Sequence, residues 1–384
     1  MPAECMDKWF NSRRPAFLAG RQFWLQKHPV LRDSPLSVLR GQAEVYCLLD
    51  SDGNSWLLKK CHPGKGLDRH YLEAVSRLLP QHPGLKTGTD RTVLTKGSLK
   101  HTPGSFFSVA LNHWLDNTIL MTRAQGVDWT AVADQLRSGS LVLQASQRLT
   151  VCQRLNELVQ VMEHHRLAHR DIACGNAFFE LSSPSCAFID FDSAFHPSLS
   201  MPKATTCGTS GYAAPFAWRG DYLDACATWC EHADRYACAI LSAEILVLGP
   251  QSPMTGEGGI FDQDDLRRRS GKTVDHAADA LAQHYSQALS LFRAAIKSRG
   301  FDDCPSPGDW IACCQTLMAG LPRPPKLSDL EPPDPEFFRN CLHGRRTLPF
   351  WRPPRLADLN DPWPFRPGVP LPTIPLPSGP WKRH

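Results

Sequence analysis

Two short stretches near the middle of the chain carry side chains suited to phosphate chemistry. They are residues 169–176, with the sequence HRDIACGN, and residues 188–192, with the sequence FIDFD. Together they place two carboxylates and one carboxamide at the spacing that serves phosphoryl transfer from a magnesium-bound nucleotide to a hydroxyl group. Asp171 is the candidate base for the hydroxyl proton, and Asn176 and Asp190 are the candidate magnesium ligands.

Length and composition limit what the rest of the chain can be. Its 384 residues can form one large two-lobed domain or two smaller ones. The net charge of +4 is too small to favour a nucleic-acid or membrane-surface protein. No apolar run reaches the roughly 18–20 residues that span a bilayer, and no signal-peptide pattern begins the chain. We therefore expect a cytoplasmic protein with no membrane span and no nucleic-acid partner, whose 14 cysteines are mostly free thiols.

Strand patterns dominate the first third of the chain, and helical patterns dominate the part that follows it. Residues 1–35 form an aromatic and basic extension, which is either a docking or membrane-surface segment or a strap packed on its own domain. Strands are expected over residues 43–49, 55–60, 92–94, 106–110 and 118–121. Helices are expected over residues 68–79, 130–136, 145–165, 237–248, 277–297 and 309–318.

The end of the chain has a different composition. About half of the 33 prolines fall after residue 320. Such a segment favours extended polyproline conformation over helices or a sheet. It could dock a partner through an SH3-like or WW-like groove, wrap back on the domain through its aromatic residues, or stay disordered.

Three motifs together resemble those of the protein kinases. The His-Arg-Asp sequence followed by Asn176, and the apolar-Asp-Phe sequence at Asp190, resemble the kinase catalytic core. Residues 207–215 (CGTSGYAAP) resemble the end of a protein-kinase activation segment. The DFDS sequence at 190–193, with small residues after Asp171, is similar to a divergent bacterial branch of the serine/threonine kinases.

This resemblance implies a fold and a domain layout. The expected class is α+β, a two-lobed protein-kinase-like fold with a small antiparallel β-rich N-lobe and a larger helical C-lobe. The N-lobe would span residues 36–125 and the C-lobe residues 126–320. The proline-rich C-terminal extension would cover residues 321–384.

The resemblance also implies an ATP site in the N-lobe. Lys59, at the end of the expected strand 55–60, matches the phosphate-binding lysine, and strand alternation favours it over Lys60. Glu73 on the following helix would be its acidic partner, with Asp68 as the alternative. The residues expected to line the nucleotide are Gly41, Val45, Leu57 and Met121.

Further matching positions would support the catalytic loop. By resemblance, His169 and Arg170 belong to the catalytic motif, and Thr209 would position Asp171 and the substrate hydroxyl. Asp234 would hydrogen-bond the backbone of that loop, or simply cap the helix that follows it. The polar residues between the two motifs are either regulatory phosphorylation sites near Arg170 or ordinary loop residues: Ser193, Ser198, Ser200, Thr205 and Thr206.

The chain departs from the kinase pattern at several positions. Gly41 alone remains of the glycine-rich loop, one position out of register, and Ala173 stands where serine/threonine kinases carry a lysine. Phe216 and Cys304 replace the glutamate and arginine of a buried ion pair. Because losing one partner strands a buried charge, whereas replacing both can be neutral, the joint change indicates a coherent variant.

Three functions are consistent with these residues. The first is an ATP- and Mg²⁺-dependent serine/threonine protein kinase, with autophosphorylation on the activation segment. The second, suggested by the missing glycines and Ala173, is a pseudokinase scaffold that binds nucleotide weakly or not at all. The third is a small-molecule phosphotransferase, against which the activation-segment motif argues.

Overall fold

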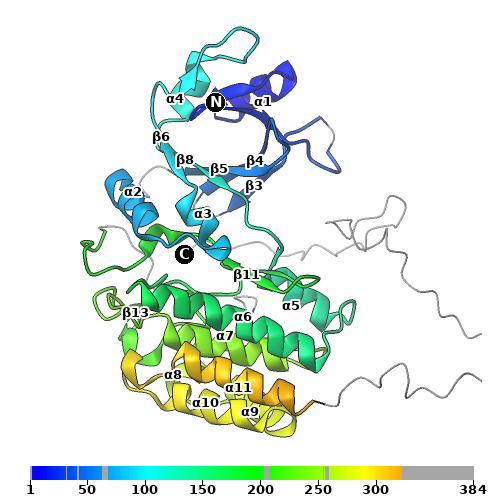
Figure 1. Ribbon diagram of the computed structural model, residues 1–384, viewed down its shortest axis with the longest axis vertical. Coiled ribbons are helices and arrows are strands. Elements are labelled where there is room, and N and C mark those ends of the chain that lie inside the picture. The colour runs from blue at the N-terminus through cyan, green and yellow to red at the C-terminus, as the bar shows by residue number, and fades with distance from the viewer. Residues whose placement is uncertain are drawn as a thin grey trace, which may run out of the picture. The chain divides into compact units, whose positions relative to one another are not determined.

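The computed structural model describes residues 2–31, 33–40, 43–62, 68–202, 208–253, 255 and 259–321. Gly41 and the predicted proline-rich tail beyond Leu321 lie outside the described residues. Within the described part the chain has a two-lobed α+β fold, with an antiparallel N-lobe sheet and a helical C-lobe, as the sequence predicts (Figure 1).

The N-lobe sheet has eight strands in the described residues, and it is curled (Figure 1). The curled sheet surrounds a cluster of buried apolar side chains. The strand order is β6-β8-β5-β4-β2-β1-β7, with β3 paired to β4. The bounds are β1 Ala16–Leu18, β2 Arg21–Leu25, β3 Ser37–Arg40, β4 Ala43–Asp50, β5 Ser55–Cys61, β6 Thr92–Leu94, β7 Leu99–Lys100 and β8 Thr118–Thr122. The strands predicted at 43–49, 55–60, 92–94 and 118–121 are confirmed.

The N-terminal residues are part of this lobe. Strands β1 and β2 belong to the same sheet as β5, so the lobe begins before the predicted boundary at residue 36. Helix α1 (Pro2–Ser12) places Met6 and Trp9 in the core of the curled sheet, where neither is more than 1% exposed. Of the two interpretations of this segment, the packed strap is therefore confirmed for these residues.

One predicted strand, residues 106–110, is wrong. The chain there enters a short helix, α4 (Val109–Trp114). The Ser108 side chain caps this helix by accepting a hydrogen bond from the Leu111 backbone N–H. Leu111 and Trp114 then turn into the core of the curled sheet. A helix one and a half turns long is too short to reveal its period in the sequence.

The segment between β5 and β8 carries helices α2 (Arg69–Leu78) and α3 (Lys86–Thr89), with a 3₁₀ turn at Pro83–Leu85 between them. Asp68 caps α2 by accepting from the Tyr71 N–H at 3.0 Å. Tyr71, Leu72 and Val75 form the buried side of α2, and they belong to the apolar cluster of the C-lobe.

The C-lobe is built on seven helices of the described residues (Figure 1). They are α5 Trp129–Arg137, α6 Ala145–His164, α7 Arg235–Val247, α8 Gln263–Arg268, α9 Lys272–His284, α10 Ser286–Lys297 and α11 Pro307–Ala319. The single helix predicted over 277–297 is wrong, because buried Tyr285 leaves helical geometry at φ −144° and separates α9 from α10. None of the described helices is long and apolar enough to cross a membrane.

Small strands frame the loops between α6 and α7. They are β9 Val127–Asp128, β10 Ala177–Glu180 and β11 Ser185–Phe188, which form one three-stranded sheet, and the hairpin β12 Trp218–Arg219 with β13 Tyr222–Leu223. The β10–β11 pair directly joins the two stretches that carry the candidate catalytic residues. It therefore fixes the distance between them.

Candidate active site

Asp171 is held from both sides by neutral hydrogen-bond donors. The Thr209 hydroxyl donates to Oδ1 at 2.8 Å, and the Asn176 amide nitrogen donates to Oδ2 at 3.2 Å and to the Asp171 carbonyl at 2.9 Å. Burial raises the pKa of the Asp171 carboxyl, against the lowering effect of the Thr209 hydrogen bond. A fixed carboxylate with a raised pKa is suited to accept a proton from a hydroxyl group.

Asp234 supports the backbone of the same loop. Its carboxylate is 2% exposed and accepts from the His169 N–H at 2.5 Å and the Arg170 N–H at 2.7 Å. Although Asp234 stands at the N-cap position of α7, its side chain makes no capping bond to the helix. The two oxygens thus serve the catalytic loop rather than α7, which distinguishes between the two roles open from the sequence.

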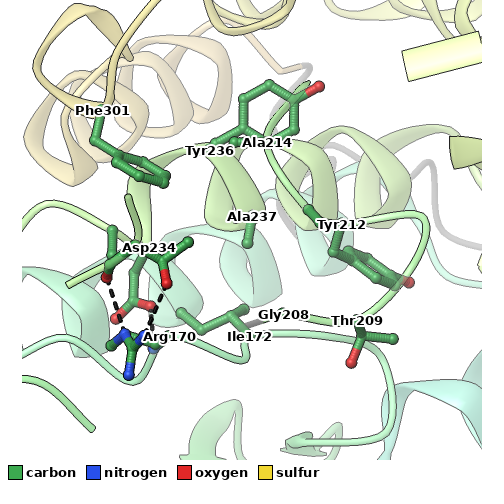
Figure 2. A pocket seen from close by; sticks show the side chains of 13 residues that line it. Arg170, Ile172, Gly208, Thr209, Tyr212, Ala214, Asp234, Tyr236, Ala237 and Phe301 are labelled. Carbon is green, nitrogen blue, oxygen red and sulfur yellow. Dashed lines mark hydrogen bonds between the residues drawn. The ribbon is translucent and has the colours of Figure 1, made fainter. Parts of the chain in front are cut away.

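A small cavity lies beside this support. Its lining includes Arg170, Thr209, Asp234, Tyr236 and Phe301, and Figure 2 shows Phe301 and Tyr236 on the side away from Thr209. Its volume is about 20 Å³, which is enough for about one water molecule. The cavity is therefore a packing feature beneath the activation segment and far too small for a nucleotide.

The Arg170 side chain is engaged by backbone carbonyls. Its guanidinium donates to the carbonyls of Thr228, Ser193 and Ala225, each at 2.9 Å, and to the Thr228 hydroxyl at 2.8 Å. It also lies over the Trp229 ring, 4.6 Å from the centroid. This buried arginine ties the residues after Asp190 to the loop that precedes α7.

Of the polar residues proposed as phosphorylation sites, Ser193 is 3% exposed, whereas Ser198 and Ser200 are exposed. Thr205 and Thr206 lie outside the described residues. The structure therefore leaves the two exposed serines as the accessible hydroxyls among the described candidates.

Strand β11 delivers Asp190 to the site. The residue adopts the left-handed backbone conformation, with φ +65°, which is strained for a residue that has a Cβ. Phe191 then packs inward with 1% exposure, edge-on to the His169 ring at 4.8 Å. Gly88 in α3 makes room for it, because a Cβ there would lie 2.7 Å from the Phe191 ring. The buried phenylalanine holds Asp190 facing the N-lobe.

Lys59 meets Asp190 across the two lobes. The Lys59 ammonium lies 2.5 Å from Asp190 Oδ1 and 2.9 Å from Asp192 Oδ2. Burial lowers the pKa of Lys59, but Asp192 and Asp190 outweigh it and raise that pKa above its ordinary value. The neighbouring Lys60 points elsewhere and donates to the Asp116 carbonyl. Strand alternation thus selects Lys59 as the lysine of the site.

Glu73 is not brought to Lys59. Its carboxylate pairs with Arg69, one turn earlier on α2, at 2.6 Å, and its side chain is 36% exposed. The predicted Lys59–Glu73 ion pair is therefore absent from the described contacts. The alternative partner, Asp68, caps α2 instead. The register of α2 explains the difference, because its buried side carries Tyr71, Leu72 and Val75 rather than Glu73.

Arg91 is a site residue that the sequence reasoning missed. It immediately precedes β6, and its side chain is 3% exposed. The guanidinium donates to Asp192 Oδ1 at 3.1 Å, to the Ser76 hydroxyl at 2.8 Å and to the Leu72 carbonyl at 3.1 Å. The only signal in the sequence was an unusual aspartate, Asp192, in the third position of the metal motif. Nothing in the spacing pointed to an arginine so far from it in the chain.

One face of the N-lobe sheet carries the predicted nucleotide contacts. Val45 is the register partner of Lys59, and Leu57 is that of Met121. Because directly opposed residues share a face, and Leu57 and Lys59 are two apart, all four side chains belong to the same face. The alternate residues of β5, Trp56 and Leu58, pack in the core of the curled sheet.

The donor set fits a magnesium ion. Among the described residues, no group of three or more His, Cys, Asp and Glu side chains is placed to hold a metal. Asp190 offers a carboxylate that is 39% exposed, and Asn176 a carboxamide oriented by its hydrogen bonds to Asp171. Magnesium takes one or two such protein oxygens and completes its shell with water and phosphate oxygens. The side chains therefore fit this ion without forming a closed protein cage.

The departures from the kinase pattern have structural counterparts. Ala173 is 2% exposed and packs in the C-lobe core. The Phe216 ring lies 4.8 Å from that of Phe301 and 6.1 Å from that of Tyr236. Cys304 is buried and donates to the Ser298 hydroxyl. An aromatic cluster thus stands where the sequence lacks the buried ion pair.

No protein-family model and no curated protein matches the chain. Among solved structures, it is similar to the kinase domain of PknI from Mycobacterium tuberculosis, at 16% identity and a TM-score of 0.45, over 78% of this chain and 97% of that one. A mutant of the same domain gives 16% identity and a TM-score of 0.48, over 79% and 97% of the two chains.

Proposed function

We propose that this chain transfers the terminal phosphoryl group of ATP to a hydroxyl group, as a protein kinase does. The observation that carries the proposal is the meeting of Lys59 and Asp190 at 2.5 Å, from a sheet face in one lobe and a loop in the other. Asp171, itself hydrogen-bonded to Thr209 and Asn176, belongs to the loop that leads into Asp190 through β10 and β11. A lysine, a candidate base and two candidate metal ligands thus lie together, and a shared catalytic role explains this arrangement better than chance does.

Each residue has a chemical role in this proposal. The sheet face with Val45, Leu57 and Met121 would cover the adenine with apolar side chains, and Lys59 would exchange its carboxylate contacts for phosphate oxygens. Asp171 would orient the attacking hydroxyl and accept its proton. Positioning of this kind supplies most of the catalysis in phosphoryl transfer, because the transition state needs little covalent help.

Magnesium would be held by Asp190 and Asn176. When bound, the ion neutralises charge on the phosphate oxygens of the nucleotide. Asp190 is poised for this role because Phe191 is buried behind it. Asn176 is oriented by Asp171, so the carboxamide and the base are set by one hydrogen-bond network.

The activation segment favours a protein substrate with a serine or threonine hydroxyl. Thr209 contacts the candidate base directly, at 2.8 Å. Tyr212, three residues later, is buried and donates to Glu244 at 3.0 Å. This segment is thus tied to the catalytic loop at one end and to α7 at the other. A peptide laid along it would present its hydroxyl to Asp171, and autophosphorylation at Ser198 or Ser200 is compatible with their exposure.

The test is phosphoryl transfer by the purified full chain. With labelled ATP and Mg²⁺, the wild type should label itself or a generic protein substrate, and Asp190→Ala and Asp171→Asn should each lower the rate at least about 100-fold. A peptide and a panel of small hydroxyl compounds should be compared as acceptors. A wild type that transfers no more label than Asp190→Ala would refute the proposal.

A nucleotide-binding pseudokinase is the second candidate. It is favoured by buried Ala173, which leaves no lysine beside Asp171 on the catalytic loop. A melting-temperature rise with ATP and Mg²⁺ but no transfer to any acceptor would select this candidate. If ATP and Mg²⁺ cause neither a rise in melting temperature nor phosphoryl transfer, the chain is a scaffold that does not bind nucleotide. Docking of such a scaffold through the proline-rich tail stays a prediction. The cytoplasmic location also stays a prediction.

A further inference from the structure

Helix α2 supplies no acidic side chain to Lys59 among the described contacts. Glu73 pairs with Arg69 on the same helix, so α2 has no carboxylate at Lys59 among the described contacts. Lys59 instead takes its two carboxylates, Asp190 and Asp192, from the segment after β11. If Asp190 binds a metal ion, Asp192 is the remaining carboxylate that pairs with Lys59 among the described contacts. The position of Lys59 then depends on the contacts that fix Asp192.

Arg91 contacts both Asp192 and α2. One guanidinium nitrogen donates to Asp192 Oδ1 at 3.1 Å, while the other side of the fork donates to the Leu72 carbonyl at 3.1 Å and the Ser76 hydroxyl at 2.8 Å. The Ser76 hydroxyl in turn donates to the Leu72 carbonyl at 2.9 Å. A planar guanidinium can make these contacts simultaneously, whereas a lysine ammonium presents no such fork.

Burial makes this arrangement specific. The Arg91 side chain is 3% exposed, that of Lys59 12% and that of Asp192 33%. Burial lowers the pKa of Arg91, and the negative charge of Asp192 opposes this shift. Removing the carboxylate partner of a buried arginine costs free energy, because the positive charge then stays buried without compensation. Arg91 and Asp192 are therefore held to one another.

A second contact ties the same two segments together. The Tyr71 hydroxyl on α2 donates to the Ala194 carbonyl, two residues after Asp192. Tyr71 is 7% exposed and packs in the C-lobe cluster. Helix α2 is thus fastened to the segment after β11 through its buried tyrosine and through Arg91, and Glu73 takes part in neither contact.

We propose that Arg91 is a positioning residue for the reaction, which sets the place of Lys59 relative to α2 through Asp192. In this assignment Asp192 supplies the carboxylate that keeps Lys59 directed at the phosphates, and Arg91 transmits the position of α2 to Asp192. The role of Lys59 in phosphate binding rests on the function proposed above, whereas the link between α2 and Asp192 does not. A shift of α2 moves Arg91, and with it the lysine that orients the phosphates.

The test compares substitution of Arg91, which contacts α2, with substitutions on α2 itself, all in the full chain. Arg91→Met should lower kcat at least about tenfold while the KM for ATP changes less than about threefold, because misplaced Lys59 still binds but orients the phosphates poorly. Arg91→Lys should restore only part of kcat, because it keeps the charge and loses the fork. Glu73→Gln should leave both parameters within about twofold of wild type. The matched control is Arg77→Met, which removes an exposed arginine from the same helix.

A second measurement does not depend on activity. Amide hydrogen exchange across residues 69–78 should speed up in Arg91→Met and in the double variant with Asp192→Asn, and should stay at the wild-type rate in Glu73→Gln and Arg77→Met. The double variant is included because Asp192→Asn alone strands a buried charge and can fail to fold. If the wild type neither transfers phosphate nor binds ATP, the proposed function fails, and the exchange rates alone decide the link through Arg91.

Two results would overturn the assignment. One is a wild-type kcat in Arg91→Met together with a collapsed kcat in Glu73→Gln, which would return the acidic partner of Lys59 to α2. The other is unchanged exchange of residues 69–78 in both variants that lack Arg91. The predicted pattern in kcat and exchange together would support it, because a purely structural arginine would lower stability without separating kcat from KM.

Discussion

Glu244 is a buried carboxyl group at the junction of the activation segment and α7. It is 0% exposed and accepts hydrogen bonds from the Trp129 ring N–H at 2.9 Å, the Tyr212 hydroxyl at 3.0 Å and the Ile260 N–H at 3.2 Å. Burial raises its pKa to about 7, although these donors and the charge of Arg137 lower it. Three donors, with no cation in direct contact among the residues that the structure describes, do not fully compensate a buried charge.

The raised pKa of Glu244 predicts the direction in which the free energy of unfolding changes with pH. The folded-state value of about 7 exceeds the ordinary value of 4.5, so the folded state binds the extra proton between these pH values. The contribution of Glu244 to the free energy of unfolding is then complete below pH 4.5 and falls as the pH rises towards 7. The loss amounts to at most about 1.4 kcal/mol per pH unit.

The measurement is urea unfolding of wild type and Glu244→Gln at several pH values from 4.5 to 7.5. The free-energy difference between the two proteins should change with pH across this window, because the variant lacks the titrating group. Asp264→Asn, at a side chain 71% exposed, is the control for removal of a carboxyl at the surface. A difference between wild type and Glu244→Gln that is constant with pH would contradict the assignment.

At the scale of elements, an aromatic cluster lies below the segment 208–215, at the position where the kinase pattern carries a buried ion pair. Phe216 follows the segment, Tyr236 begins α7, and Phe301 precedes α11. Edge-to-face ring pairs add to simple area burial, and they need no desolvated ion pair. The joint absence of glutamate at 216 and arginine at 304 is consistent with this cluster.

Substitutions at Phe216 test that view. Phe216→Ala should lower the free energy of unfolding by about 1–3 kcal/mol, less than for a wholly buried phenylalanine because this ring is half-buried. Phe216→Glu should cost more than Phe216→Ala, because the carboxylate would lie against two aromatic rings.

Chemical denaturation followed by tryptophan fluorescence gives both values. The control is Tyr222→Ala in the β12–β13 hairpin, whose side chain is 64% exposed and whose loss should change stability by less than about 0.5 kcal/mol. A Phe216→Glu protein as stable as Phe216→Ala would show that the site is solvated and that the rings do not act as an anchor.

Local sequence patterns predicted most of the named helices and strands, but they did not predict which distant side chains contact one another. Strand alternation selected Lys59 over Lys60, and the turn between residues 49 and 55 predicted the β4–β5 hairpin. The partner of Lys59 depended on which side of α2 is buried and on Arg91, which packs from a distant segment. No periodicity encodes such a contact. The N-terminal strands were missed because β1 and β2 are short and gain their apolar contacts only within the curled sheet.

At the scale of the whole molecule, the buried apolar side chains of the described residues form two separate clusters. One fills the curled sheet and includes Trp9, Phe23, Trp56 and Trp114. The other runs from α2 and part of β8 through the helices of the C-lobe. The boundary between the clusters thus passes through the N-lobe, and α2 packs with the helical body. The candidate active site lies where Lys59, on the sheet, meets residues anchored in the second cluster.

Separate clusters predict separate local stabilities. Trp9 is 1% exposed and packs only in the cluster of the curled sheet, so Trp9→Ala should destabilise that part by about 3–5 kcal/mol. Native-state hydrogen exchange should then speed up in β1, β2 and β4 and stay at the wild-type rate in α6 and α7. Phe10→Ala, at a partly buried neighbour on the same helix, should show a smaller change in the same strands. Equal acceleration in α6 and in the strands would mean that the two clusters unfold as one unit, and that α1 stabilises the whole molecule rather than the curled sheet.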